Sequence, residues 1–184
     1  MEYKLTAPCT AADLAPLRAG DTVLLSGVVY TARDQAHKRM IEALDAGEAL
    51  PFPLEGSAIY YVGPTPERPG QVIGSAGPTT SGRMDSMSPR LLDLGNKIMI
   101  GKGKRDAAVK AAVRRNGAVY LAALGGAGAL MAKSVRSLEV IAWPDLGCEA
   151  VRRLEVEDMP LTVILDSVGG DLYESGPAAY LASL

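Results

Sequence analysis

The chain has few of the residues that build metal centres. Its 184 residues include two cysteines and one histidine, and Cys9, His37 and Cys148 stand far apart in the sequence. A structural zinc site takes four Cys or His ligands at close spacing, and an iron–sulfur cluster takes several cysteines. The chain alone therefore cannot build either centre, and we expect no metal ligand in it.

Strong net charge, aromatic residues and long apolar runs are also scarce. The formal net charge is −2, which gives no electrostatic reason for nucleic acid binding. Aromatic residues make up 5%, so Ala, Val, Ile, Leu and Met must fill the core. The apolar runs fall far short of the roughly 18 residues of a membrane span, and residues 1–6 lack the pattern of a secretory signal. We therefore expect a cytoplasmic protein that binds neither nucleic acid nor membrane.

The length and composition suit one domain over residues 1–184, with 48% hydrophobic and 22% charged residues. Clusters of Val, Ile, Leu and Tyr predict strands at 22–30, 58–62, 71–75, 97–100, 118–122, 138–142, 151–156 and 161–166. Helical spacing of apolar residues predicts helices at 33–46, 89–94, 106–116 and 126–135. Because strands adjoin strands in some places and helices in others, the pattern predicts an α/β fold with helices layered on a mixed sheet.

The first candidate site lies where a predicted strand meets a helix, at Ser26–Lys38. Thr31 suits the N-cap position, and Arg33 falls in the first helical turn. A helix N-terminus carries partial positive charge, so an arginine there is unfavourable unless an anion binds between it and the free N–H groups. His37 lies one turn further along the same face, after Asp34. The alternative is a capped helix with Arg33 in solvent and His37 in a packing role.

The second candidate is the loop Gly77-Pro78-Thr79-Thr80-Ser81-Gly82-Arg83-Met84-Asp85. Its two glycines let the backbone approach a ligand, and Arg83 offers a planar fork of donors that matches a carboxylate or phosphate. The alternative is a turn whose hydroxyls cap the following helix. Three hydroxyls with Arg83 and Asp85 are more polar groups than a cap requires, which favours an anion site.

Two glycine-rich segments follow further along the chain. Ile98–Arg105 is a strand that ends in glycines around Lys102, without the hydroxyl that a phosphate-binding P-loop needs; the alternative is a basic surface turn. Leu124–Leu130 lacks the spacing of a dinucleotide loop, and we expect it to pack a helix start closely against the sheet.

Arg33, Thr79 with Arg83, and Lys102 each follow a predicted strand. In layered α/β folds such strand-end loops gather along one edge and form the ligand crevice. Three cations that converge on one crevice predict a ligand with more than one negative charge.

Several long motifs, spread over nearly the whole chain, carry a resemblance to a known family. They are Gly20-Asp21 to Gly27, Thr31-Ala32-Arg33-Asp34 with Ala36-His37-Lys38, Tyr61-Val62-Gly63-Pro64, Gly74 to Asp85, Ile100-Gly101-Lys102-Gly103, Gly125-Gly126, Leu146-Gly147 with Glu149-Ala150, and Val156-Glu157-Asp158-Met159-Pro160. In this order they resemble the C-terminal half of class I iron–sulfur fumarases. That half also occurs as a separate β subunit in two-subunit fumarases and in L-tartrate dehydratase.

The resemblance implies a swivelling β/β/α domain. It also implies a [4Fe–4S] cluster that is ligated by cysteines of a partner α subunit and not by this chain. The implied activity is the reversible hydration of fumarate to L-malate by the two subunits together, as an α2β2 heterotetramer acting on a small dicarboxylate.

The resemblance further implies roles for single residues. Arg33 and Arg83 correspond to clamps on the substrate carboxylates. Thr79 corresponds to a proton-transferring hydroxyl, and Lys102 to a further anion contact that stabilises charge, so Thr79 and Lys102 are the predicted catalytic residues. The predicted supporting residues are Asp34, His37, Thr80 and Asp85.

The surroundings of the arginines favour fumarate over tartrate. The tartrate type carries a bulkier residue in place of Gly82 and Glu in place of Asp85. Mesaconate would use the same arginines, and its extra methyl group is worth only about 1–3 kcal/mol in a pocket. The alternatives are an L-tartrate or mesaconate-type dehydratase subunit and a non-catalytic module that binds dicarboxylates.

Overall fold

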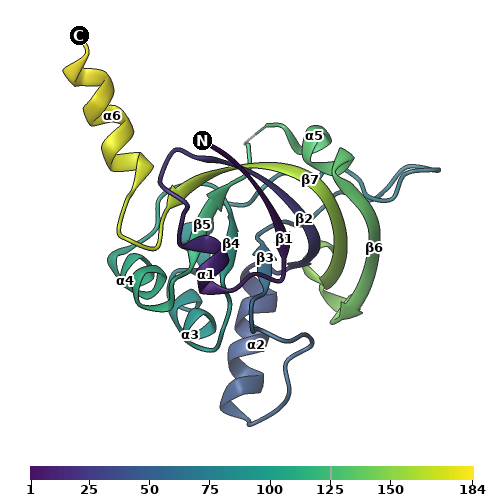
Figure 1. The fold of residues 1–184 in the computed structure, drawn as a ribbon. Helices are drawn as coiled ribbons and strands as arrows, with labels where there is room; N and C mark the ends of the chain where they lie inside the picture. The colour runs from purple at the N-terminus through teal and green to yellow at the C-terminus, as the bar shows by residue number, and fades with distance from the viewer. Residues whose placement is uncertain (125) are drawn as a thin grey trace.

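The computed structural model describes residues 1–124 and 126–184 (Figure 1). The strands are β1 (Glu2–Ala7), β2 (Thr22–Thr31), β3 (Ala58–Tyr60), β4 (Ile98–Gly101), β5 (Val119–Ala122), β6 (Val135–Ala142) and β7 (Val151–Leu165). The helices are α1 (Ala11–Leu14), α2 (Asp34–Asp45), α3 (Ser88–Asp93), α4 (Ala107–Asn116), α5 (Gly128–Lys133) and α6 (Leu172–Ala182), with 3₁₀ turns η1 (Ser81–Met84) and η2 (Pro144–Glu149). None of the described helices is both long and apolar enough to cross a bilayer.

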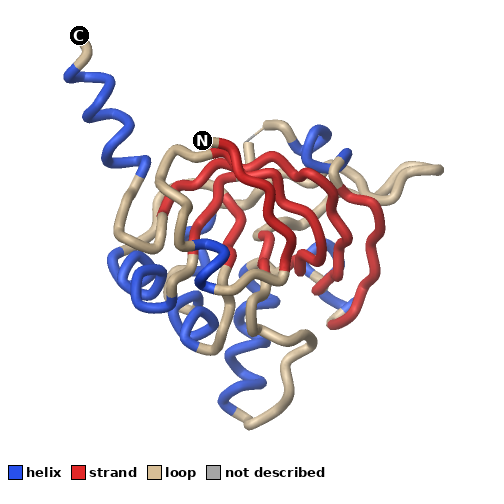
Figure 2. The backbone as a smooth tube through the Cα atoms, viewed as in Figure 1, coloured by secondary structure: helices blue, strands red, loops and turns tan. Residues whose placement is uncertain are grey.

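The strands form one mixed sheet that closes on itself (Figure 2). Their order is β1-β2-β3-β4-β5-β7-β6, and β2 also pairs with β7. Neighbours from β1 to β5 run parallel, whereas β7 runs antiparallel to β5, β2 and β6. Strands β2, β3, β4, β5 and β7 therefore make a barrel-like ring, with β1 and β6 at its edges.

The short parallel strands β3, β4 and β5 are buried on both faces, as strands covered on both sides must be. Alternate residues fill the inside of the ring: Tyr60, Ile100 and Leu121. The residues between them point outward beneath α2, α3 and α4: Tyr61, Met99 and Tyr120. The helices cover that outer face with Ala36, Met40, Leu91, Leu92, Val109 and Val113. The site described below lies where this helix layer meets the ends of the strands.

The predicted α/β class with a mixed sheet is confirmed, and so are the predicted strands at β2, β3, β4, β5 and β6 and the helices at α2, α3 and α4, to within a few residues. The predicted helix 126–135 is shorter, since α5 begins at Gly128, whose carbonyl accepts a hydrogen bond from Ala76 N–H (3.0 Å). Gly125, which belongs to the same predicted packing segment, lies outside the described residues. The sequence reasoning did not predict β1, α1 or α6.

The predicted strand 71–75 is wrong, because this segment pairs with its own loop instead of a strand. Thr65 N–H donates to the Ser75 carbonyl (3.1 Å), and Ser75 N–H donates to Thr65 Oγ1 (2.8 Å). The segments around Thr65 and Ser75 form an arm that lies outside the sheet and connects β3 to the loop that begins at Gly77.

The two strands predicted at 151–156 and 161–166 are one strand, β7, because Glu157–Pro160 bends the strand without ending it. The pairing with β2 shifts between Leu25 and Gly27. Asp158 takes a left-handed conformation there (φ 47°), and its N–H donates to Ser26 Oγ (3.0 Å). A bulge of this kind increases bend and twist. It lets β7 pair with β6 in its first half, follow β2 on both sides of the bulge, and reach β5 with its last residues.

Candidate functional site

Arg33 lies at the point where β2 leads into α2 and is the N-cap residue of that helix. Thr31, the predicted cap, donates instead to the Ala150 carbonyl (3.3 Å) and accepts from Arg152 N–H (3.0 Å). Arg33 Nη2 lies 3.2 Å from Glu149 Oε1. Glu149 Oε2 accepts a hydrogen bond from Gln35 N–H in the first turn of α2 (2.9 Å). The anion beside this arginine and helix N-terminus therefore belongs to the chain itself.

Asp34 lies between the two arginines of the predicted clamp. Its Oδ1 is 3.0 Å from Arg83 Nε, and its Oδ2 is 3.8 Å from Arg33 Nε. Arg33 has 19% of its side chain exposed, whereas Arg83, in η1, has 54% exposed. Asp34 fixes the inner edge of the Arg83 guanidinium. Among the described residues, the Nη groups of Arg83 have no hydrogen-bonding partner. The outer edge of Arg83 is therefore available to a ligand.

His37 is fully buried one turn after Arg33. Its Nδ1 lies 3.0 Å from the Arg33 carbonyl, which can only accept, so in the neutral ring Nδ1 carries the proton and Nε2 is an acceptor. Burial lowers the pKa of His37 to about 4, which keeps the ring neutral near pH 7. His37 Nε2, Arg33 Nε and Asp34 Oδ2 are buried without a hydrogen-bonding partner in the described part of the chain. Buried polar atoms seldom lack a hydrogen-bonding partner, and these three belong to one helical turn.

The loop from Gly77 to Asp85 adds a strand-like segment beside the ends of β3 and β4. Thr79 N–H donates to the Tyr61 carbonyl (2.7 Å), and Thr80 forms a parallel bridge with Lys102. Ser81 N–H donates to the Lys102 carbonyl (2.8 Å), while Lys102 N–H donates to Ser81 Oγ (3.0 Å). These bonds bring the backbones of Thr79, Thr80 and Lys102 to the same edge, with Thr79 partly buried and the other two exposed.

The close approach of the two segments depends on Gly101. A Cβ atom on this residue would lie 2.0 Å from Ser81 Oγ. By contrast, a Cβ on Gly77 or Gly82 would meet no atom of the described chain closer than 3.7 Å. The described neighbours of Gly77 and Gly82 would therefore meet a side chain at ordinary contact distance and do not by themselves require glycine there.

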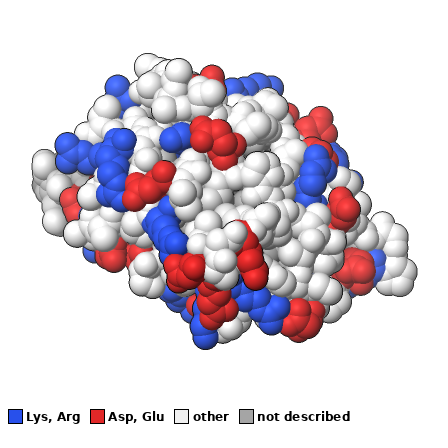
Figure 3. Space-filling view, turned by 90° about the horizontal axis from the view of Figure 1, so that it is seen from below, with Lys and Arg blue, Asp and Glu red and all other residues white. Residues whose placement is uncertain are grey.

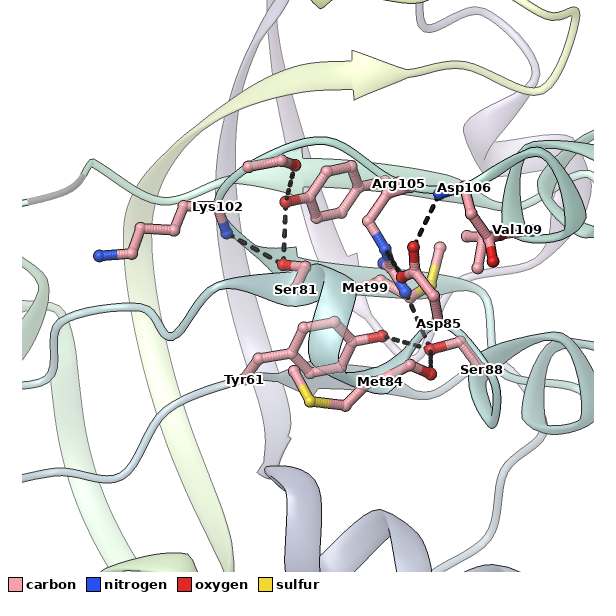
Figure 4. A network of polar contacts seen from close by, with 12 residues as sticks. Tyr61, Ser81, Met84, Asp85, Ser88, Met99, Lys102, Arg105, Asp106 and Val109 are labelled. Atoms are coloured by element: carbon pink, nitrogen blue, oxygen red, sulfur yellow. Dashed lines mark hydrogen bonds and ion pairs between the residues drawn. The ribbon is translucent and has the colours of Figure 1, made fainter.

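Asp85 does not contact Arg83, and it belongs to a separate buried network (Figure 4). Its Oδ1 accepts from Arg105 Nε (2.6 Å), and its Oδ2 accepts from Asp106 N–H (2.7 Å). Arg105 also donates to Ser88 Oγ (2.9 Å). The Arg105 guanidinium lies between two aromatic rings, 5.4 Å from the centroid of Tyr61 and 5.0 Å from that of Tyr120. Asp85 thus ties the end of the ligand loop to the segment that follows β4.

Lys102 points away from this network in Figure 4. Its side chain forms no ion pair among the described residues, and no contact joins it to the arginines. On the face shown in Figure 3, Lys and Arg side chains are interspersed with Asp and Glu. The structure gathers Arg33, Asp34, His37 and Arg83 closely. It joins the backbones of the Thr79–Ser81 segment and Lys102 to each other, and no contact links the side chains of Thr79 and Lys102 to the arginines in the described part of the chain.

A family model described as "Fumarase C-terminus" matches residues 1–176. The chain belongs to this family. It is 41% identical over 167 residues to fumarate hydratase 2 of Leishmania major, covering 88% of this chain and 29% of that protein. It is 39% identical over 165 residues to the aerobic class I fumarate hydratase of Escherichia coli K12, covering 89% of this chain and 30% of that protein.

A third relative has nearly the same extent as this chain. The putative L(+)-tartrate dehydratase subunit beta of Methanocaldococcus jannaschii is 42% identical over 180 residues, covering 95% of this chain and 92% of that protein. The chain thus spans about three tenths of the length of the fumarate hydratases that it matches. It corresponds to one part of those proteins and to nearly all of the tartrate dehydratase subunit.

The residues of this fumarase C-terminus domain do not fit an iron–sulfur cluster. In the described chain no three His, Cys, Asp or Glu side chains gather in a way that could hold a metal ion. Cys9 is buried beside the Thr6 carbonyl, and Cys148 is exposed in η2. The polar groups at the site are two arginines, the carboxylates of Asp34 and Glu149 that pair with them, and the loop hydroxyls, and the arginines suit an anion and not a metal.

Two charged residues that contact the site or its supporting network were not predicted from the sequence. Glu149 belongs to one of the motifs of the family resemblance but has no predicted role, although it is the anion beside Arg33. Arg105 was read as part of a basic turn, although it is buried. No local pattern marks either residue, since the partners of Glu149 at Gln35 and Arg33 are more than a hundred residues away.

Proposed function

We propose that this chain is the β subunit of a two-subunit hydro-lyase that reversibly hydrates a small dicarboxylate, with fumarate and L-malate as the leading substrate pair. The observation that carries the proposal is the Arg33–Asp34–Arg83 arrangement, in which one carboxylate braces two arginines at a strand end. The names of the relatives support the reaction class, because they are fumarate hydratases and tartrate dehydratase β subunits.

Arg83 is the stronger of the two carboxylate ligands. Its Nε is held by Asp34 at 3.0 Å, and its side chain is more than half exposed. A guanidinium offers two parallel N–H donors to a carboxylate. Because Asp34 already restrains the side chain, less conformational entropy is lost when substrate binds. Arg33 is more enclosed and would contact the second carboxylate through its exposed edge.

The charges on this chain do not fully balance a dicarboxylate. Two carboxylates, Asp34 and Glu149, lie on Arg33 and Arg83, and Lys102 remains as the unpaired cation of the predicted set. A dianionic substrate therefore requires further positive charge from elsewhere. We assign that charge to a partner α subunit, which would also hold the [4Fe–4S] cluster that the family resemblance implies, in an α2β2 assembly.

Thr79 is our candidate for proton transfer at its Oγ1. An alcohol is a poor base in water, so this role requires neighbouring positive charge that stabilises the alkoxide. Our candidate for that charge is Lys102, whose backbone is joined by a bridge to that of Thr80, the residue next to Thr79. Thr80 and Ser81 hold that geometry through the backbone.

Co-expression with the α subunit tests the proposal. The complex is purified anaerobically and its cluster is reconstituted. The assay follows the loss of fumarate absorbance as its double bond is hydrated, and the complex with Thr79→Val is the matched control. We expect L-malate from the wild-type complex and at least a hundredfold less from the variant. A cluster-loaded complex that forms no malate would exclude the fumarate proposal.

L-Tartrate is the second candidate substrate. It is favoured by the relative from Methanocaldococcus jannaschii, since that tartrate dehydratase subunit matches this chain over 92% of its own length. The same complex is assayed with L-tartrate and with mesaconate. A ratio of kcat/KM above ten for one substrate over fumarate would move the assignment to that substrate. Tight dicarboxylate binding by this chain without a partner, and no turnover by the complex, would instead indicate a non-catalytic binding module.

A further inference from the structure

The Arg33 guanidinium lies in a slot whose walls come from three separate segments. Glu149 from η2 lies 3.2 Å from its Nη2, and Asp34 lies 3.8 Å from its Nε. The third wall is Gly63, where a Cβ atom would come within 2.7 Å of Arg33 Nη1. Only about a fifth of the Arg33 side chain is exposed. The slot therefore leaves only a small part of this side chain accessible.

The wall formed by Glu149 is itself held in place. One carboxylate oxygen contacts Arg33, and the other accepts the Gln35 N–H at 2.9 Å. The adjoining backbone is held by Arg152, which donates to the carbonyls of Gly147, Cys148 and Ala150, each at 2.9 Å. A carboxylate with both oxygens engaged on a fixed backbone acts as a rigid support.

We propose that Glu149 is a positioning residue, which orients Arg33 so that its exposed edge meets a substrate carboxylate. The inference rests on the proposed function, in which Arg33 binds substrate. Glu149 does not touch the reacting atoms in this assignment. It acts through Arg33, and it also supplies the negative charge that keeps this enclosed guanidinium paired when no substrate is bound.

The chain offers a matched control in Asp145. This residue belongs to the same η2 segment and also pairs with α2, through Arg39. The Asp145 side chain is 61% exposed, whereas that of Glu149 is 17% exposed. If Glu149 only fastened η2 to α2, removal of either charge would have the same effect. If Glu149 orients Arg33, only its own removal disturbs the site.

The first test reads Arg33 directly in the full chain, without any partner. The Nε–H resonance of Arg33 is assigned in a ¹⁵N-labelled sample by its loss in Arg33→Lys. We expect a sharp, shifted signal in the wild-type chain and in Asp145→Asn. We expect Glu149→Gln to move this signal toward the position of exposed arginines and to broaden it. An unchanged Arg33 signal in folded Glu149→Gln would overturn the proposal, whatever the activity of the complex.

The second test uses the complex with the α subunit. Glu149→Gln should raise KM for the dicarboxylate at least tenfold and change kcat less than threefold, since ground-state and transition-state binding are lost together. In the Arg33→Met background, Glu149→Gln should have no further effect on KM. A kcat loss equal to that of Asp145→Asn, with unchanged KM, would contradict the proposal. An inactive wild-type complex would exclude the proposed function and leave the Arg33 signal to decide the positioning role.

Gly63→Ala changes the slot without altering a charge. The added methyl group would displace the Arg33 guanidinium, so we expect the same rise in KM and the same broadening of the Arg33 signal. This variant decides the question if Glu149→Gln fails to fold. Wild-type KM and an unchanged signal in Gly63→Ala would show that Arg33 is not held by the slot.

Discussion

Two clusters of arginine and carboxylate meet at the loop that carries Arg83 and Asp85. They differ in how completely their polar atoms are hydrogen-bonded. In the buried cluster, Arg105 is completely enclosed and donates to Asp85, Ser88 and the sulfur of Met99. In the cluster at the sheet edge, Arg33 Nε and Asp34 Oδ2 have no hydrogen-bonding partner in the described chain. The same residue types form a saturated pair in one place and an incomplete one in the other.

The difference separates a structural ion pair from a binding site. Buried charged groups are stable when every donor and acceptor is used, and they then contribute rigidity. In the incomplete cluster the accessible donors are those of Arg83, whose side chain is 54% exposed, and they are open to a ligand. The share of polar atoms that are hydrogen-bonded therefore distinguishes the two arginine clusters better than their composition does. Each cluster can be disrupted separately by mutation.

The largest effect is expected from the buried cluster. Arg105→Met leaves the buried Asp85 carboxylate without its cation, and removal of one partner from a buried ion pair costs about 3–5 kcal/mol. We expect a loss of this size in the free energy of unfolding, measured by urea denaturation. Arg115→Met, which breaks the exposed pair with Asp93, is the control and should cost less than about 1 kcal/mol. Equal losses in the two variants would mean that Arg105 is no more important to the fold than a surface pair.

The incomplete cluster should respond in activity and not in stability. Arg83→Lys removes the planar fork, and we expect at least a hundredfold loss of kcat/KM in the complex with the α subunit, about 2.7 kcal/mol of transition-state stabilisation. The free energy of unfolding should change by less than about 0.5 kcal/mol. Arg90→Lys, at the exposed pair with Asp45, controls for loss of a surface guanidinium. Activity within a few-fold of wild type would make Arg83 a structural residue.

A smaller effect concerns His37, which lies between the two clusters. Its folded pKa is lowered to about 4 by burial, whereas an unfolded histidine titrates near 6.5. Between these values the unfolded chain binds the extra proton, so the stabilisation is complete above pH 6.5 and is lost as the pH falls toward 4. Relative to His37→Phe, the wild-type chain should lose about 2 kcal/mol of unfolding free energy between pH 7 and pH 5. Parallel curves for the two proteins would show that His37 is not held neutral.

The sequence predicted the elements whose signals are local. The apolar stripe of α2 and the buried runs of β3, β4 and β5 depend on adjacent residues, and so do the motifs that place Arg33 after β2 and Lys102 after β4. Thr79 and Thr80 do not follow a strand as expected, since 71–75 is not one; their segment lies beside the end of β4 through backbone contacts with Tyr61 and Lys102.

The parts that the sequence did not predict depend on distant contacts. Pro160 and Glu157-Asp158 look like a strand break, and only the pairing with β2 shows that β7 continues through them. Glu149 becomes a site residue because η2 folds back onto α2. Arg105 is buried because Tyr61 and Tyr120 enclose it, and a run of glycine and lysine before it looks like a surface turn. In each case the deciding partner is remote in sequence.

The pairing of β2 with β7 also has a consequence for how the protein is made. Thr31 and Arg152 are joined across 121 residues, and contacts this remote in sequence slow folding because a long loop must close first. During translation β2 is synthesised long before its partner leaves the ribosome. The ring can form only after β7 has emerged, so the edge that holds Arg33 beside Glu149 is among the last parts of the nascent chain to fold.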